Sequence, residues 1–502
     1  MTIAELHTPQ EAARWLRARV RGSLCTDSRR VQPGDGFVAW PGAAVDGRAF
    51  VGAALAQGAA ACLVEDEGHA HFDFDAQAPV ARYAQLKAAC GPIADAYFES
   101  PSQALAMLAV TGTNGKTSTA WWLAHALSKL KRPALSPCAL AGTLGVGLPA
   151  ALEATGLTTP DPVTLHARLR ALVQQGVRAC ALEASSIGLA EHRLDGVALR
   201  VAVFTNFTQD HLDYHGSMSA YWQAKQALFD WPGLQAAVVN LDDPRGGALA
   251  ERVRARGLDV WTVSLQGAAR LVGGPLGWGE RGLRWRVTEG EQDVVMETNQ
   301  IGDYNAANLM GVLGTLRALG VALPQAAAAC ADLPAVPGRL ERVDVAGGPL
   351  AVVDYAHTPD ALDKVLHALR PLAARRGGRL WCVFGCGGNR DAGKRPQMAA
   401  VAERLADQVV ITSDNPRHED PQAIVVAVCA GLAQPGRARV VVDRALAITE
   451  ALTHAQPEDV VLIAGKGHED YQEVAGHRLP FSDQAVARTA LTQRAARAGA
   501  RA

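Results

Sequence analysis

One glycine-rich segment has the residue types and spacing of a phosphate-binding loop. The segment Thr111–Ser118 (TGTNGKTS) follows the apolar run Leu105–Val110 and precedes Trp121–Leu130, whose apolar residues recur with helical period. In a strand–loop–helix, backbone N–H groups and the helix N-terminus attract phosphate. Lys116 can reach the β- and γ-phosphates, and the Thr117 hydroxyl can ligate Mg²⁺. The segment therefore predicts a nucleoside triphosphate site built from Gly112, Thr113, Asn114, Gly115, Lys116, Thr117 and Ser118.

Two further polar groups follow apolar runs. Glu183 comes directly after Cys180–Leu182, and His211 follows Val201–Phe204. The carboxyl ends of parallel strands meet at one sheet edge, so we expect both groups near the loop. There they could hold a Mg²⁺ ion that neutralises charge during phosphoryl transfer. A packing histidine, or a transition-metal site over His211–His215, are the alternatives.

The elements that position these groups alternate along the chain. Short apolar runs alternate with longer Ala/Leu-rich segments of helical period, which predicts βαβ units and a mainly parallel α/β fold. The other expected strands are Val238–Asn240, Val352–Asp354, Leu380–Phe384, Val409–Thr412, Val440–Val442 and Val460–Ala464. Turn-rich seams near Ser100 and Pro334–Gly338 divide the chain into three predicted domains, 1–100, 101–337 and 338–502, the central one P-loop-type and the last Rossmann-like.

The composition excludes several classes of protein. Lys and Arg number 49 against 50 Asp and Glu, so no broad basic face for nucleic acid is expected. The nine cysteines are scattered, which argues against a disulfide framework or a zinc site. The N-terminus lacks a signal-peptide pattern, and the longest apolar stretch, Val51–Val64, is too short to span a bilayer. We expect a cytoplasmic monomer without membrane insertion.

The loop GTNGKT and the segment Thr205–His215, of form T-N-x-x-x-D-H-L-D-x-H, resemble those of the Mur ligases and their folylpolyglutamate synthetase relatives. The loop departs from the general phosphate-loop pattern at Val110, where that pattern has glycine. The resemblance implies ATP and Mg²⁺ as cofactors and the catalytic residues Lys116, Glu183, His211 and Lys225. It also implies that Lys225 is carbamylated and joins Thr117, Glu183 and His211 as metal ligands; the ordinary interpretation of Lys225 is a solvated helix lysine.

The N-terminal segments Thr26–Arg30 and Gly42–Gly47 resemble the uridine-binding segments of the muramoyl-adding branch, which folylpolyglutamate synthetases lack. The resemblance implies a UDP-N-acetylmuramoyl-L-alanyl-D-glutamate substrate bound by Thr26, Ser28, Ala43, Ala44, Val45, Thr158, Thr159, Ser185, Glu191 and Arg193. Two positions depart from the family pattern: Leu157 stands where asparagine is frequent, and Glu191 where glutamine is usual.

In the third predicted domain, Asp354–Asp360 (DYAHTPD) resembles the family segment that closes over the nucleotide. The implied nucleotide contacts are Asn305, Asn308, Arg339 and Asp354. The signature Asp414-Asn415-Pro416-Arg417 resembles that of the diaminopimelate-adding branch. A guanidinium can pair with the extra carboxylate of diaminopimelate, which lysine lacks. The implied amino-acid site comprises Arg390, Asp414, Asn415, Pro416, Arg417, Gly465 and Glu469.

The resulting prediction is an ATP-dependent amide ligase of peptidoglycan synthesis. It adds meso-2,6-diaminopimelate to the D-Glu γ-carboxylate of the UDP-muramoyl dipeptide through an acyl-phosphate. The alternatives are a lysine-adding Mur ligase and a P-loop regulatory NTPase that needs no amine acceptor.

Overall fold

The computed structural model describes residues 3–42, 45–74, 77–280 and 282–499. The chain forms two compact units. The first comprises 1–277, 284–298 and 307–333, and the second comprises 278–283, 299–306 and 334–502. Among the described residues, no helix is both long and apolar enough to cross a bilayer. The division into three domains stays a prediction.

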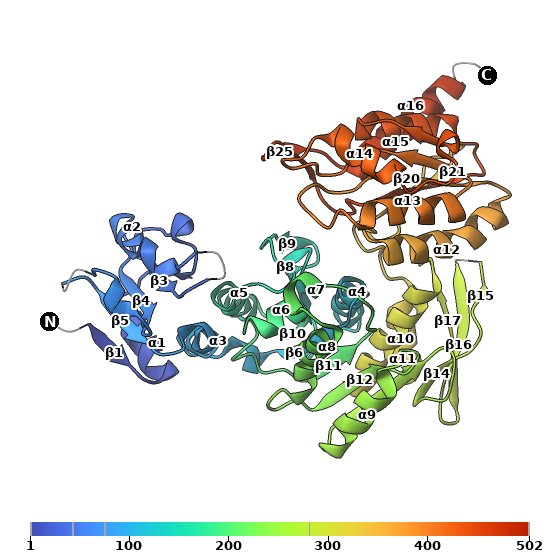
Figure 1. The fold of residues 1–502 in the computed structure, drawn as a ribbon. Helices are drawn as coiled ribbons and strands as arrows, with labels where there is room; N and C mark the ends of the chain where they lie inside the picture. The colour runs from blue at the N-terminus through green and yellow to red at the C-terminus, as the bar shows by residue number, and fades with distance from the viewer. Residues whose placement is uncertain (1–2, 43–44, 75–76, 281, 500–502) are drawn as a thin grey trace. The chain divides into compact units, whose positions relative to one another are not determined.

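The first unit begins with a small parallel sheet (Figure 1). Its apolar strand residues are buried against helices on both sides. In spatial order the strands are β1 (Ala4–Leu6), β5 (Val80–Tyr83), β4 (Ala61–Glu65), β3 (Gly36–Ala39) and β2 (Leu24–Cys25). The helices are α1 (Pro9–Arg17), α2 (Val51–Ala56) and α3 (Leu86–Tyr97).

A second, larger sheet carries the predicted phosphate loop. Its parallel centre consists of β13 (Asp259–Ser264), β12 (Ala236–Asn240), β11 (Val201–Phe204), β6 (Ala106–Thr111), β10 (Ala179–Glu183) and β7 (Cys138–Gly142). These central strands are buried on both faces, which explains their continuous apolar runs. Val110 pairs with Glu183, and Thr111 pairs with Phe204. This register brings the loops that follow β6, β10 and β11 to one edge of the sheet.

Helices cover both faces of this sheet. One face packs apolar residues of α5 and α9, and the other contacts α4 and α10, whose Gly314 lies against Val238 and Val263. The helices are α4 (Lys116–Lys129), α5 (Pro162–Gln174), α6 (Ser186–Ala190), α7 (Leu212–His215), α8 (Met218–Gln226), α9 (Gly246–Ala255), α10 (Asp303–Ala318) and α11 (Leu323–Ala331).

The sheet also has edges that the apolar runs do not predict. They are β8 (Gly145–Leu148), β9 (Ala151–Glu153), β14 (Leu271–Gly273), β15 (Gly277–Trp278), β16 (Leu283–Glu289) and β17 (Gln292–Thr298). β8 and β9 extend β7 in antiparallel pairing, and β14 pairs antiparallel with β16. These strands are short or alternate buried with exposed residues, so they lack the continuous apolar signal of a central strand.

The second unit contains another mainly parallel sheet covered by helices on both faces (Figure 1). Its strand order is β18 (Glu341–Val343), β19 (Leu350–Asp354), β23 (Val460–Ala464), β20 (Leu380–Phe384), β21 (Gln408–Ile411) and β22 (Ala438–Val440), with a separate hairpin β24 (Tyr471–Val474) and β25 (His477–Pro480). One face packs α12 (Pro359–Arg376), α13 (Lys394–Leu405) and α14 (Pro421–Cys429), and the other packs α15 (Arg444–His454) and α16 (Asp483–Gly499).

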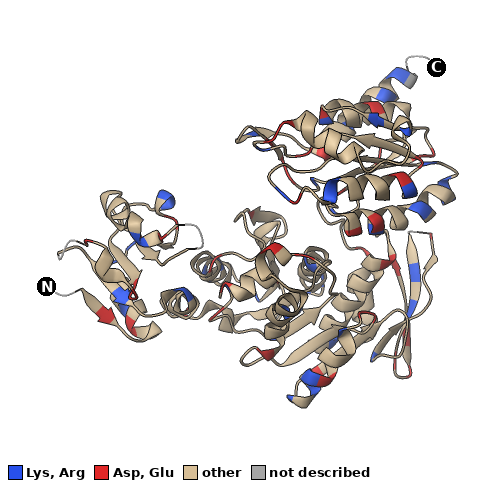
Figure 2. Ribbon diagram, viewed as in Figure 1, with Lys and Arg blue, Asp and Glu red and all other residues tan. Residues whose placement is uncertain are grey.

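The α/β class and the mainly parallel sheets confirm the sequence prediction. β11, β20 and β23 begin and end where expected, and the other predicted strands differ by one or two residues at their ends. Lys and Arg residues are intermixed with Asp and Glu residues along the ribbons of both units (Figure 2).

Candidate active site

The predicted phosphate loop leaves β6 and enters α4, as expected. Gly115 is the N-cap residue of α4, with φ of 85°, and as a glycine it supplies no side-chain cap to the first turn. The N–H groups of that turn therefore point outward from a helix end that carries partial positive charge. The geometry suits a bound phosphate.

Both loop glycines are required by their surroundings. Gly112 and Gly115 have φ of 149° and 85°, in the left-handed half of backbone space. A Cβ on Gly112 would overlap the Thr205 hydroxyl, and one on Gly115 would overlap the Asn308 amide. Asn308, a predicted nucleotide contact, therefore lies directly against the loop.

The end of β11 holds the loop in place. Asn206 Oδ1 accepts a hydrogen bond from Asn114 N (2.9 Å), and Thr205 Oγ1 donates to Asn114 O (2.6 Å). Lys116 Nζ donates to the carbonyl oxygens of Gly112 and Thr113, both at 2.9 Å. The ammonium thus lies over the loop, within reach of any phosphate bound there.

Glu183 is fully buried at the end of β10 and faces this loop. Its Oε2 accepts hydrogen bonds from Thr117 Oγ1 (2.8 Å) and Thr143 Oγ1 (3.2 Å), and its Oε1 accepts one from Thr143 N (2.8 Å). The Thr143 hydroxyl oxygen also lies within hydrogen-bond distance of Thr158 Oγ1 (3.1 Å). Thr143, which the sequence did not single out, connects the predicted metal ligands to the predicted dipeptide site.

Lys225 lies beneath the loop rather than in solvent. Its side chain is buried in α8, and its Nζ donates to Gly112 O at 2.7 Å. Burial, and secondly the charge of Lys116, hold the pKa of Lys225 well below its ordinary value. The interpretation of Lys225 as a solvated helix lysine is therefore wrong, because its side chain is buried.

His211 is the N-cap residue of α7, with φ of 51°, and its ring contacts Tyr221 of α8 at a centroid distance of 5.9 Å. Burial lowers its pKa, partly opposed by Asp210, so the neutral imidazole that binds metals is favoured. The Tyr221 hydroxyl lies 3.1 Å from Thr113 Oγ1, and this contact joins α8 to the phosphate loop.

Magnesium is compatible with these groups. Among the described residues there is no cluster of three or more His, Cys, Asp or Glu side chains able to hold a metal, so the alternative of a transition-metal site gains no support. Mg²⁺ prefers oxygen ligands and keeps several waters or substrate phosphates. The hydrogen bond between Thr117 and Glu183 brings two of the predicted oxygen ligands together.

The predicted dipeptide residues Thr159, Ser185 and Arg193 form one hydrogen-bonded group. Thr159 Oγ1 lies 2.9 Å from Ser185 Oγ and donates to Glu183 O (2.8 Å), while Arg193 Nη1 donates to Thr159 O (3.1 Å). Ser185 also caps α6 through Gly188 N. These contacts place Arg193 beside the strand end that carries Glu183.

The negative charge of Glu191, unusual for the family, has a partner. Lys87 Nζ of α3 lies 2.7 Å from Glu191 Oε2, and the Tyr214 hydroxyl donates to Oε1 of the same carboxylate. Although burial acts in the opposite direction, these partners lower the pKa of Glu191. The added charge is therefore balanced by a lysine that the sequence did not single out. Leu157, the other departure, is 40% exposed.

The predicted uridine-binding residues lie in turns of the small sheet. Thr26 Oγ1 is 3.5 Å from Asp161 Oδ1, the carboxylate that caps α5, and Ser28 begins a 3-10 turn capped by Asp27. Val45 is exposed, and Ala43 and Ala44 lie outside the described residues.

In the second unit, Asp354 orders the backbone around Arg339. Its buried carboxylate accepts hydrogen bonds from Leu340 N and Ala356 N, both at 2.8 Å. Burial raises the pKa of Asp354, opposed by Arg339 and these N–H groups. The Arg339 guanidinium lies over the Tyr355 ring, 4.5 Å from its centroid. Asn305, buried in α10, donates to Ile301 O at 2.8 Å.

The predicted amino-acid residues are brought together by loops that follow neighbouring strands. Arg417 Nη1 donates to Gly388 O (2.8 Å), Gly388 N donates to Asn415 O (2.9 Å), and Asn415 Nδ2 donates to Glu469 Oε2 (2.8 Å). A Cβ on Gly465 would overlap the Asp414 carboxylate, and one on Gly388 would overlap Pro416 O. Arg390, two residues beyond Gly388, is exposed.

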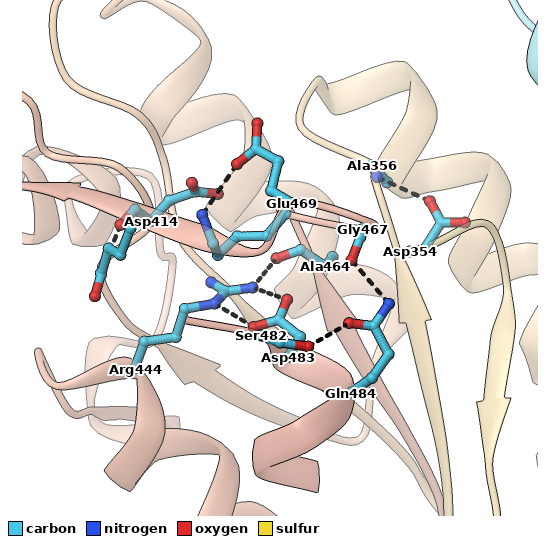
Figure 3. A network of polar contacts seen from close by, with 12 residues as sticks. Asp354, Ala356, Asp414, Arg444, Ala464, Gly467, Glu469, Ser482, Asp483 and Gln484 are labelled. Atoms are coloured by element: carbon cyan, nitrogen blue, oxygen red, sulfur yellow. Dashed lines mark hydrogen bonds and ion pairs between the residues drawn. The ribbon is translucent and has the colours of Figure 1, made fainter. Parts of the chain in front are cut away.

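Behind this site lies a buried ion pair that the sequence did not reveal (Figure 3). Arg444 and Asp483 are fully buried and bond at 2.7 and 2.8 Å. Arg444 also donates to Ser413 O (3.2 Å) and Ala464 O (3.0 Å), the carbonyls directly before Asp414 and Gly465. The pair thus ties together the ends of β21 and β23, from which the predicted amino-acid residues extend.

Comparisons with known proteins agree with this architecture. Three family models match in order: the Mur ligase family catalytic domain over 23–109, the Mur ligase middle domain over 110–316, and the Mur ligase glutamate ligase domain over 338–467.

Curated relatives cover nearly the whole chain. A UDP-N-acetylmuramoyl-L-alanyl-D-glutamate–2,6-diaminopimelate ligase of Acidovorax sp. (strain JS42) is 61% identical over 97% of this chain and 98% of its own length. A protein of the same name from Pseudomonas aeruginosa is 45% identical over 93% of this chain and 94% of its own length.

Among solved structures, one of a ligase with that same name has a TM-score of 0.65, 34% identity, and coverage of 94% of this chain and 95% of its own. The structure of a Thermotoga maritima MurF ligase in complex with ADP shares the fold. Its TM-score is 0.61 at 18% sequence identity, and the match covers 95% of this chain and 97% of that chain. With three family models matching in sequence order and a 61% identical relative covered almost end to end, the chain belongs to the Mur ligase family.

Proposed function

We propose that this chain is an ATP-dependent ligase that joins meso-2,6-diaminopimelate to the D-Glu γ-carboxylate of UDP-N-acetylmuramoyl-L-alanyl-D-glutamate in peptidoglycan synthesis. The observation that carries the proposal is the joining of Arg417, Asn415 and Glu469 in one hydrogen-bonded site, in a chain whose relatives are named as that ligase. Because the substrates are polar, nucleotide-linked or zwitterionic, we propose that the protein acts in the cytoplasm. That it acts as a monomer stays a prediction of the sequence.

The chemistry follows from the phosphate loop. The γ-carboxylate attacks the γ-phosphorus of ATP, ADP leaves, and an acyl-phosphate forms. The amine of diaminopimelate then attacks the acyl carbon, the C–O bond to phosphate breaks, and an amide and inorganic phosphate result. Lys116 and the first-turn N–H groups of α4 stabilise the charge that develops on the transferred phosphoryl group.

Mg²⁺, when bound, neutralises phosphate charge in this site. We propose Thr117, Glu183, His211 and a carbamate on Lys225 as the residues that hold it. Carbamate formation requires a neutral amine, which adds to CO₂ and releases a proton. The lowered pKa of Lys225 supports this modification, because it raises the fraction of neutral amine relative to an ordinary lysine.

The substrate assignments rest on the described contacts. We propose that the group of Thr158, Thr159, Ser185 and Arg193 binds the dipeptide, with Glu191 beside it. We propose that Arg390 and Arg417 bind the distal carboxylate of diaminopimelate, and that Glu469 binds the distal ammonium. The nucleotide contacts, Asn305, Asn308, Arg339 and Asp354, and the uridine contacts, Thr26, Ser28 and Val45, remain part of the same proposal.

The test measures ADP and amide product with the UDP-muramoyl dipeptide, with and without diaminopimelate or L-lysine. We expect both products to depend on the dipeptide and on diaminopimelate, with lysine a poor substitute. An ADP rate unaffected by the dipeptide would instead identify an NTPase, and faster amide formation with lysine would identify the lysine-adding branch. Arg417→Ala should raise the KM for diaminopimelate far more than the KM for ATP.

A further inference from the structure

Lys466 is a buried charge at the centre of the proposed amino-acid site. It lies between Gly465 and Gly467, directly after β23, and its side chain is 0% exposed. Burying an ammonium is costly unless it is paired and hydrogen-bonded. The burial of Lys466 therefore depends on the groups that pair with its ammonium.

Both hydrogen-bond partners that the structure gives Lys466 belong to the proposed diaminopimelate site. Its Nζ donates to Asn415 Oδ1 and to Glu469 Oε2, each at 3.0 Å. Since Asn415 Nδ2 donates to the same Glu469 oxygen at 2.8 Å, the three side chains form a closed triangle.

The triangle fixes the orientation of the Asn415 amide. Its Oδ1 accepts from both Lys466 Nζ and Glu473 N, each at 3.0 Å, so the Nδ2 group must face Glu469. The ammonium therefore contacts both the Glu469 carboxylate and the Asn415 amide, and together with Glu473 N it fixes which end of the amide faces Glu469.

Charge balance gives this arrangement a second consequence. Glu469, 18% exposed in its side chain, is paired with buried Lys466, and Arg417, 20% exposed, has Glu473 3.7 Å away. Each partly exposed charge thus has an opposite charge beside it. Such a site matches a zwitterionic head, which brings one carboxylate and one ammonium, better than a lone ammonium.

We propose that Lys466 is a positioning and specificity-determining residue: it holds Asn415 and Glu469 in place and lowers the attraction of Glu469 for a bare ammonium. This rests on the proposed function. Without the lysine charge, Glu469 becomes an uncompensated anion, which favours the cationic side chain of L-lysine relative to the neutral head of diaminopimelate.

The experiment compares the full-length wild type with Lys466→Met, which has a similar shape without the charge, and Lys466→Arg, which keeps the charge. Lys364→Met is the matched control, because Lys364 pairs with Asp360 on the surface of α12. For each protein, kcat and KM are measured for diaminopimelate, L-lysine, ATP and the UDP-muramoyl dipeptide, together with the thermal unfolding midpoint.

We expect Lys466→Met to raise the KM for diaminopimelate about tenfold and to leave the KM for ATP within about twofold. In Lys466→Met, the ratio of kcat/KM for diaminopimelate to kcat/KM for lysine should fall about tenfold. Lys466→Arg should have a ratio between those of the wild type and Lys466→Met, and Lys364→Met should have the wild-type ratio. Equal increases in the KM values for ATP and diaminopimelate, or an unchanged selectivity ratio, would overturn the role of Lys466.

A second variant keeps the proposal testable if Lys466→Met does not fold. Glu469→Gln leaves the lysine cation unbalanced, so it should reduce the use of lysine more than that of diaminopimelate; the opposite order contradicts the charge argument. A wild-type protein that forms no amide with either amino acid overturns the proposed function itself. Wild-type diaminopimelate turnover with unaltered selectivity in the variants overturns the role of Lys466 alone.

Discussion

Lys225 shows how one side chain's surroundings change its chemistry. Its Nζ is buried against the carbonyl of Gly112 and close to the charge of Lys116, so the protonated form is disfavoured. Because the folded-state pKa is lowered, an unmodified Lys225 reduces stability at neutral pH, and this loss shrinks as the pH rises toward the ordinary lysine pKa. Carbamylation removes the unfavourable cation.

The first prediction concerns that carbamate. Lys225→Ala should lower kcat by at least about a hundredfold, because the carbamate is a proposed metal ligand. Short carboxylic acids such as formate or acetate should restore part of the activity by occupying the vacated space. Mass spectrometry of the intact wild type should show one added CO₂ near neutral pH and its loss on acidification; failure of rescue together with an unmodified mass contradicts the proposal.

The second prediction concerns Lys87 and Glu191. Lys87→Met leaves an uncompensated carboxylate beside an anionic substrate, so the KM for the UDP-muramoyl dipeptide should rise about two- to fivefold. The double variant Lys87→Met with Glu191→Gln should return toward the wild-type KM, with a coupling of about 0.5–1 kcal/mol for this partly exposed pair. Because the folded-state pKa of Glu191 is lowered, the coupling should persist near neutral pH and fade as the pH falls through that pKa. Additive effects of the two substitutions would show that the pair is not coupled.

The joint between β6 and α4 depends on backbone conformation and close packing together. Gly115 has positive φ, and a Cβ there would also overlap Asn308. Gly176, after α5, has a comparable φ of 82°, but a Cβ there would meet nothing within 4 Å. Substitutions at the two glycines can therefore distinguish the free-energy cost of the backbone conformation from the effect of displacing the phosphate loop.

The third prediction uses this comparison. Gly176→Ala should lower the free energy of unfolding by about 1–2 kcal/mol and leave the KM for ATP unchanged. Gly115→Ala should lower stability further and raise the KM for ATP at least about tenfold, because the loop must move away from Asn308. Denaturant titration and steady-state kinetics check both; equal KM values for ATP in the two variants would contradict the loop argument.

The fourth prediction concerns the ends of β21 and β23, which Arg444 and Asp483 hold together (Figure 3). Arg444→Met or Asp483→Leu alone should lower the free energy of unfolding by about 3–5 kcal/mol, because each leaves an unpaired buried charge. The double variant should recover much of that loss. It should still raise the KM for diaminopimelate, since the carbonyls before Asp414 and Gly465 lose their shared donor. If the double variant loses as much free energy of unfolding as the sum of the two single variants, Arg444 and Asp483 are not energetically coupled.

Over the full chain, the proposed substrate sites divide between the two compact units. The dipeptide residues belong to the first unit and the amino-acid residues to the second. A fifth prediction is that each ligand alone protects its own unit in hydrogen–deuterium exchange. The UDP-muramoyl dipeptide should slow exchange over 158–193, and diaminopimelate should slow it over 385–390, 414–417 and 465–469, because ligand binding opposes local opening. Diaminopimelate protection confined to the first unit would reject the proposed amino-acid site.

Much of the architecture could be predicted from local patterns. Continuous apolar runs identified β6, β10, β11, β19, β20 and β23, and the glycines and Lys116 identified the joint between β6 and α4. These signals are local because the apolar run that predicts a buried strand and the glycines that permit a turn lie close together in the chain. The edge strands β14–β17 escaped notice because they are short or because their residues alternate between buried and exposed.

The partners of charged side chains depended on tertiary structure. Lys87 with Glu191, Lys466 with Asn415, and Arg444 with Asp483 each join residues from different elements, and nothing near either residue in the sequence marks its partner. Local sequence specifies which element a residue enters and which face it occupies. Packing of distant elements decides which charges meet and how deeply they are buried, and the free energy of a charge depends strongly on both.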